Sequence, residues 1–183
     1  MNNYHINKAV NSKGYTLIEC LVTVVLLIVL LTWGVAGYQH LIARNKTTAY
    51  LNELVAAIYY ARSEALKNHM LITICKSING QQCGGNWRDG WLIFVDPLNK
   101  KQPENPEQIL RIYQALPLVD QLSWRSSLGE NDVVQFNWLG NMRQDGSFIY
   151  CPQQAKQYAG AVVISLTGRV RIDKDGVDKS ICR

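Results

Sequence analysis

The chain has 183 residues, of which 48% are hydrophobic and 18% are charged. This length and ordinary composition fit one modest globular domain with an attached segment, and they exclude long disordered tracts. The formal net charge of +5 is compatible with an anionic partner such as nucleic acid or lipid headgroups, but it is too small to identify one.

The chain begins with a polar leader, residues 1–14, which contains two lysines and no acid. Residues 17–35 are almost wholly aliphatic, enough for about 28 Å of helix, which is a membrane-spanning length. The alternative is a secretory signal peptide that is cleaved near the sequence WGVAG. Glu19 at the head of the apolar run counts against it, because an acid is costly there.

Helical periodicity continues beyond the apolar run. Apolar residues recur at i, i+3, i+4 and i+7 spacing over residues 51–65, and neither proline nor glycine interrupts residues 38–79. The pattern predicts one helix from about residue 16 to 67. We expect residues 15–43 to form a transmembrane or filament-core half and residues 44–68 an amphipathic half.

After residue 68 the pattern changes to short β-type runs separated by turn residues. The last run bends near Thr167 and Gly168 and predicts a hairpin. The fold class is therefore α+β, with a long N-terminal helix and an antiparallel β-rich domain over residues 69–183. The expected strands are residues 70–76, 90–96, 107–116, 121–127, 133–140, 147–151 and 161–173.

Four of the five cysteines follow the apolar run, which indicates two disulfides in an exported domain. Three connectivities are open, and we favour pairing of nearest neighbours, Cys75 with Cys83 and Cys151 with Cys182. A zinc site is the competing interpretation, but the chain has no CxxC pair and no histidine near these cysteines. Export of the cysteines also places the C-terminal domain outside the cytoplasm.

The sequence KGYTLIE, which heads the apolar helix, resembles the processing motif of type IV prepilins. The resemblance implies that a prepilin peptidase cuts between Gly14 and Tyr15 and methylates the new N-terminus at Tyr15. It also implies an inner-membrane protein with a periplasmic domain, which later joins other pilins in a pilus on the cell surface. In such a filament Glu19 would pair with the terminal amine of a neighbouring Tyr15.

The sequences WRDGWLIFVD and SLTGRVRID resemble the FimT/GspH group of minor pilins and pseudopilins. In the FimT-type proteins of naturally transformable bacteria, a C-terminal GRxR motif binds DNA, and residues 168–171 match it. The resemblance therefore implies a minor pilin that binds double-stranded DNA without sequence specificity for uptake in transformation. The expected DNA-binding residues are Gly168, Arg169, Arg171, Lys174, Lys179, Arg183 and Arg143.

The residues support this expectation, but they also allow a solvated strand face. If residues 169–173 form a strand, Arg169 and Arg171 share one face about 6.5 Å apart, while Val170 and Ile172 face the core. We predict no enzyme activity, no metal and no cofactor, because no catalytic, P-loop or metal-ligand pattern is present. The rival function is a structural minor pilin of the pilus tip, or an H-type pseudopilin of a type II secretion system.

Overall fold

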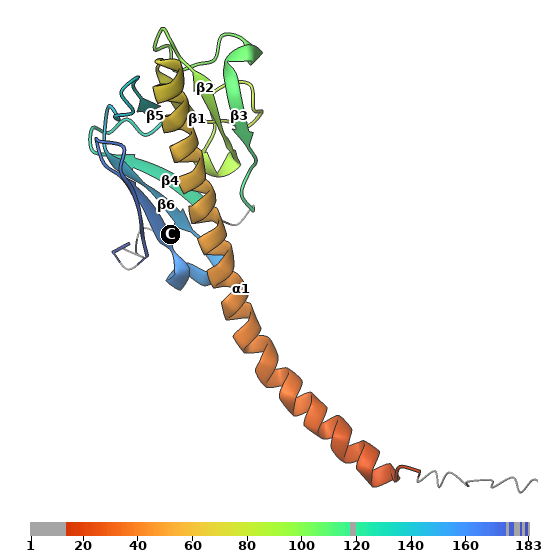
Figure 1. Ribbon diagram of the computed structural model, residues 1–183. Helices are drawn as coiled ribbons and strands as arrows, with labels where there is room; N and C mark the ends of the chain where they lie inside the picture. Colours follow the sequence, from red (N-terminus) through yellow and green to blue (C-terminus); the bar gives the residue numbers. More distant parts are fainter. Residues whose placement is uncertain (1–13, 118–119, 175, 178–179, 181, 183) are drawn as a thin grey trace, which may run out of the picture. The chain divides into compact units, whose positions relative to one another are not determined.

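The computed structural model describes residues 14–117, 120–174, 176–177, 180 and 182. Its largest element is α1 (Leu17–Asn68), shown in Figure 1. The chain divides into two compact units, residues 1–40 and residues 41–183, so α1 contributes to both. The predicted helix, residues 16–67, agrees with the observed one to within a residue at each end.

Polar groups cap the start of α1. The backbone N–H of Glu19 donates to the hydroxyl of Thr16 at 3.3 Å and to the carbonyl of Thr16 at 3.1 Å. Thr16 therefore satisfies one of the N–H groups that a helix start leaves without an intrahelical partner. The carboxylate of Glu19 lies in the first helical turn, where the helix dipole favours a negative charge.

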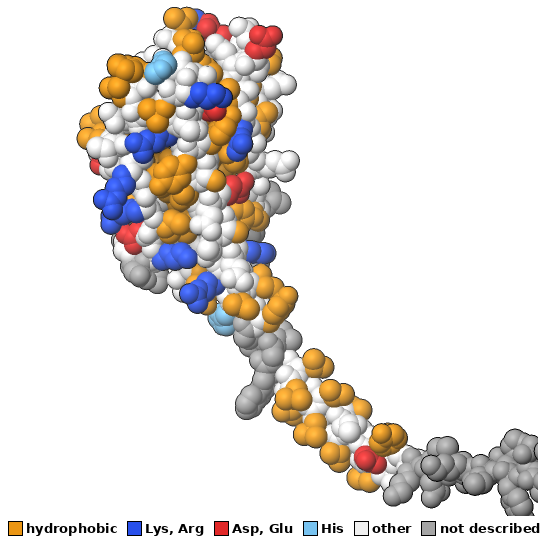
Figure 2. All heavy atoms as spheres, in the orientation of Figure 1, with side chains coloured by type: hydrophobic (Ala, Val, Ile, Leu, Met, Phe, Trp, Pro, Cys, Tyr) orange, Lys and Arg blue, Asp and Glu red, His pale blue; other side chains and the backbone are white. Residues whose placement is uncertain are grey.

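The first unit carries its apolar side chains on the surface. Between residues 17 and 31, the large aliphatic side chains are each 48% to 83% exposed. Figure 2 shows hydrophobic side chains along the visible face of this half of the helix. Within the part of the chain that the structure describes, no helix combines the length and the apolar character needed to cross a membrane.

The second unit contains two antiparallel four-stranded sheets. The first sheet has the order β3-β2-β1-β5, and the second has the order β4-β6-β7-β8. Three short 3-10 helices connect strands: η1 (Trp87–Asp89), η2 (Pro106–Gln108) and η3 (Gln153–Tyr158). The strands are β1 (Ile72–Lys76), β2 (Trp91–Val95), β3 (Ile109–Tyr113), β4 (Gln121–Ser126), β5 (Val133–Phe136), β6 (Gly146–Cys151), β7 (Gly160–Ile164) and β8 (Val170–Asp173).

Two expected strands are only about half as long as predicted. In place of the strand predicted at residues 107–116, the structure has η2 followed by the shorter strand β3. The first residues of the predicted strand are in η2, because Pro106 begins a helical turn there. The predicted strand at residues 133–140 ends at Phe136. Beyond it, the Asn137 carboxamide accepts hydrogen bonds from two backbone N–H groups, at 3.0 Å each, and closes a turn.

One hydrophobic core joins α1 to both sheets. The helix contributes the predicted apolar stripe, in which Leu51, Ala61 and Ala65 are fully buried. Trp91 from the first sheet and Phe148 from the second belong to the same buried cluster. The helix half from residue 41 onward is thus part of the globular domain, and it stabilises the sheets by apolar burial.

Both disulfides have the pairing favoured above. Cys75 in β1 bonds Cys83, and Cys151 at the end of β6 bonds Cys182. The second bond holds Cys182 against the second sheet, where it packs in a buried cluster with Ile149. Cys20 is a free, exposed cysteine.

A buried hydrogen bond connects the second sheet to the loop before β4. The Tyr150 hydroxyl donates to Asp120 Oδ2 at 2.6 Å, and both side chains are buried. Burial raises the pKa of the Tyr150 phenol well above its ordinary value, and the adjacent Asp120 raises it further. Tyr50 of α1 lies against the same ring, with 5.2 Å between centroids.

Candidate nucleic-acid interface

A tight turn between β7 and β8 presents the two arginines. The N–H of Gly168 donates to the carbonyl of Ser165 at 2.8 Å, and the N–H of Ser165 donates to the carbonyl of Arg169 at 3.0 Å. The Ser165 hydroxyl also accepts a bond from the N–H of Arg169 at 3.2 Å. These bonds fix Arg169 at the first position before β8, so the expected bend forms a hairpin.

Gly168 is buried, and it shapes the turn rather than offering a surface. Its φ of 73° lies in the left-handed region, which favours glycine. A Cβ at this position would lie 2.6 Å from the carbonyl oxygen of Gly140. Only glycine therefore allows the hairpin to approach the turn that follows β5 this closely.

Arg62 of α1 also contacts the hairpin at Gly168. Its Nη1 donates to the Gly168 carbonyl at 3.0 Å. Sequence reasoning did not identify this positioning residue, because a charge on the polar face of a helix carries no signal of a partner 106 positions away. The helical periodicity places Arg62 on the polar face of α1, but it does not indicate the contact with Gly168.

Arg169 and Arg171 are both exposed. Arg171 lies opposite Val163 in the β7–β8 ladder, and β8 is an edge strand of its sheet. Within the described residues, no ion pair involves either guanidinium. Val170 packs against the core as expected, whereas Ile172 is 38% exposed. The two arginines are thus available to an anionic ligand.

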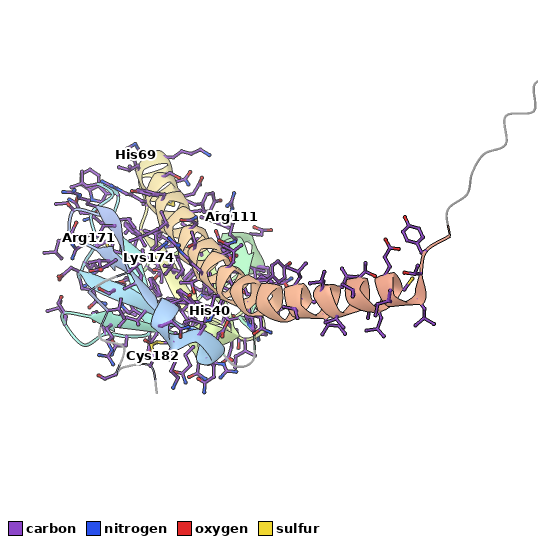
Figure 3. All side chains as sticks on the ribbon, turned by 90° about the horizontal axis from the view of Figure 1, so that it is seen from below. His40, His69, Arg111, Arg171, Lys174 and Cys182 are labelled. Carbon is purple, nitrogen blue, oxygen red and sulfur yellow. A yellow bond between two sulfur atoms is a disulfide. The ribbon has the colours of Figure 1, made fainter. Side chains whose placement is uncertain are left out.

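The other expected DNA-binding residues lie in different surroundings. Lys174 is exposed, and its Nζ donates to the Thr48 hydroxyl of α1 at 3.1 Å. Figure 3 shows Lys174 closer to α1 than Arg171. Arg143 is exposed in the segment between β5 and β6. Lys179 and Arg183 lie outside the described residues.

The processing residues lie at the start of the described chain. Tyr15 is 83% exposed, and no heavy atom lies within 4 Å of a Cβ built on Gly14. The described residues contain no group of three or more His, Cys, Asp or Glu side chains that could hold a metal ion.

A family model described as type II transport protein GspH matches residues 51–168, which is more than half of the chain. The chain belongs to the GspH family. The match covers the last third of α1 and every strand except β8, and it ends immediately before Arg169. The two exposed arginines of this GspH-family protein therefore lie just beyond the matched residues.

Solved structures of two minor filament subunits have the same α+β fold. The type IV minor pilin FimU of Pseudomonas aeruginosa is 21% identical and has a TM-score of 0.53, covering 75% of this chain and 92% of FimU. The minor pseudopilin EpsH of the Vibrio cholerae type 2 secretion system is 9% identical and has a TM-score of 0.50, covering 72% of this chain and 98% of EpsH. No curated protein matches the sequence. The GspH-family chain is thus a minor pilin or pseudopilin.

Proposed function

We propose that this minor pilin binds extracellular DNA for uptake in natural transformation. The observation that carries the proposal is the exposure of Arg169 and Arg171 on an edge hairpin, with no ion-pair partner among the described residues. Guanidinium groups form charge-assisted, forked hydrogen bonds with phosphate. Binding of this kind follows the phosphate backbone, carries little sequence information and weakens steeply with salt.

The hairpin is stiff enough to present both arginines in a constant arrangement. Gly168 and Arg62 fix the turn, and the ladder with β7 fixes the strand. Residues two apart in extended chain are about 6.6 Å apart, so Arg169, just before β8, and Arg171, within it, suit successive phosphates of one DNA strand. Lys174 adds a further cation at the other end of β8.

The N-terminal segment anchors the subunit so that the hairpin can be exposed to DNA outside the cell. In this proposal a prepilin peptidase cuts after Gly14 and methylates Tyr15, and the apolar half of α1 is held in the inner membrane with the C-terminal domain in the periplasm. The subunit then joins other pilins through the exposed aliphatic surface of residues 17–31. Glu19 meets the terminal amine of a neighbouring subunit, which offsets the cost of burying its charge.

A structural subunit without DNA binding is the second candidate. It would be a minor pilin of the pilus tip or an H-type pseudopilin of a type II secretion system. The observation that favours it is the end of the family match at Gly168, since the matched residues include neither arginine. In that case the hairpin would contact a neighbouring subunit.

Binding of the full-length chain in a non-ionic detergent to a labelled DNA duplex separates the two candidates. Wild type is compared with Arg169→Gln/Arg171→Gln and with the control Lys100→Gln/Lys101→Gln, which removes two cations from the loop after β2. We expect low-salt binding by wild type and the control, and loss of binding by the arginine variant. Equal binding by all three proteins, or no binding by wild type, contradicts the proposal.

A further inference from the structure

The outer surface of the second sheet carries an arginine at each end of one row of paired residues. Arg125 of β4 pairs with Ser147 of β6, Ser147 pairs with Val163 of β7, and Val163 pairs with Arg171 of β8. β4 and β8 are the two edge strands of the sheet. The row therefore crosses the whole sheet from one edge to the other.

Burial shows that this row faces away from the core. Trp124, Phe148 and Val162 alternate with the row along their strands and are almost fully buried. Arg125 is exposed, and Ser147 and Val163 are only partly buried. Because side chains alternate between the two faces of a sheet, the row and Arg171 share the outer face.

The register sets the separation of the two arginines. Three strand spacings of about 4.8 Å place their Cα atoms about 14 Å apart, perpendicular to β8. Between them the row contains only a serine and a valine, neither of which extends as far as an arginine. Within the described residues, no ion pair involves Arg125.

We propose that Arg125 is a third phosphate contact, and that it gives this surface a preference for duplex over single-stranded DNA. The inference rests on the proposed DNA-binding function. Arg169 and Arg171 follow one DNA strand along β8, and Arg125 lies to the side of that line. A single backbone aligned with β8 does not pass Arg125.

A second DNA strand does lie at the required distance. The minor groove of B-DNA is about 6 Å wide, and the phosphate groups on either side bring their phosphorus atoms to about 12 Å apart. Arginine side chains at both edges of a 14 Å row reach phosphates with this separation. Neither Ser147 nor Val163 projects as far as the arginines, and Cys182 packs over the next row, at Ile149 and Ala161.

Two acidic residues border the row and limit where the DNA lies. Asp145 lies just before β6, on the side of the row nearer the β7–β8 hairpin. It is partly buried and accepts a hydrogen bond from the Ser127 hydroxyl at 2.5 Å. Asp173 pairs with Ala161 on the other side and accepts a bond from the Gly176 N–H at 2.7 Å. Both carboxylates therefore favour a ligand that follows the row between them over one that spreads across the whole face.

The test compares duplex and single-stranded oligonucleotides of equal length, bound by the full-length chain in a non-ionic detergent. The variants are Arg125→Gln and the control Lys100→Gln, which removes the same charge from the first-sheet side of the domain. One phosphate contact contributes about 0.9 to the slope of log affinity against log salt. Between 1 M and 50 mM salt this slope corresponds to a gain of up to about 15-fold in affinity. We expect Arg125→Gln to lose this much for the duplex and nothing for the single strand.

The outcomes separate this inference from the proposed function. Unchanged duplex binding by Arg125→Gln, with binding lost in Arg169→Gln/Arg171→Gln, overturns the role of Arg125 and leaves DNA binding intact. Equal losses for duplex and single strand overturn the two-strand geometry. If wild type binds neither oligonucleotide, the proposed function itself fails.

Discussion

Replacement of Gly168 by alanine tests whether this glycine serves the fold of the hairpin or the ligand. Gly168 has a φ of 73°, and a Cβ there would meet the Gly140 carbonyl oxygen at 2.6 Å. Alanine in the left-handed region costs about 1 kcal/mol. Overpacking against backbone that must move adds about 1–3 kcal/mol. We therefore expect Gly168→Ala to lower the free energy of unfolding by about 2–4 kcal/mol.

Gly129→Ala is the matched control. Gly129 has a φ of 81°, and a Cβ there would have no heavy atom within 4 Å. This variant should lose only the conformational contribution, about 1 kcal/mol. Urea unfolding followed by tryptophan fluorescence is a suitable assay, because Trp87, Trp91 and Trp124 are buried. Equal destabilisation by the two substitutions would refute the close packing of the hairpin against the turn after β5.

Three further predictions concern stability and processing. Because the pKa of the Tyr150 phenol is raised in the folded protein, its contribution to the free energy of unfolding is fully present below about pH 10, the ordinary tyrosine pKa. That contribution decreases as the pH rises above this value. In denaturant titrations from pH 8 to 11, Tyr150→Phe should therefore reduce the alkaline loss, and an unchanged loss would contradict this origin. Removal of the Cys151–Cys182 disulfide, which spans 31 residues, should cost about 3.7 kcal/mol, against about 2.5 kcal/mol for the 8-residue Cys75–Cys83 loop. The reverse order of unfolding midpoints would count against the loop-entropy explanation. Intact mass of the protein from a host with the peptidase should show loss of the first 14 residues and gain of one methyl group, whereas loss of about 36 residues would indicate a signal peptide.

The sequence predicted the elements of this fold well, because each has a local signal. An uninterrupted apolar periodicity marks α1, and its observed end at Asn68 lies one residue from the prediction. The bend at Thr167 and Gly168 marked the last hairpin, since a glycine with positive φ is a local requirement. The shortening at Asn137 was missed because it depends on hydrogen bonds from two later N–H groups to the side chain.

The capping of α1 also had a local signal that the prediction did not use. Thr16 and Glu19 have the S/T-x-x-E spacing of a capping box, and Thr16 does accept a bond from the Glu19 N–H. The first-turn position adds a second physical reason for an acid at the head of an apolar helix. Within this chain the helix start accommodates the carboxylate, and assembly would add a partner for it.

The arrangement of strands had no local signal. Arg125 and Arg171 are 46 positions apart, and alternation with Trp124 and Val170 indicates only that each faces away from the core. Their common row follows from the order β4-β6-β7-β8 and the register of three ladders. The contact of Arg62 with Gly168 likewise depends on the packing of α1 against the second sheet.

The salt dependence of duplex binding tests the central claim most directly. If Arg169 and Arg171 each contact a phosphate, Arg169→Gln/Arg171→Gln should reduce the slope of log affinity against log salt by about 1.8 relative to wild type. The control Lys100→Gln/Lys101→Gln should leave the slope unchanged. Equal slopes for wild type and the arginine variant would contradict DNA binding through this hairpin and favour a purely structural subunit.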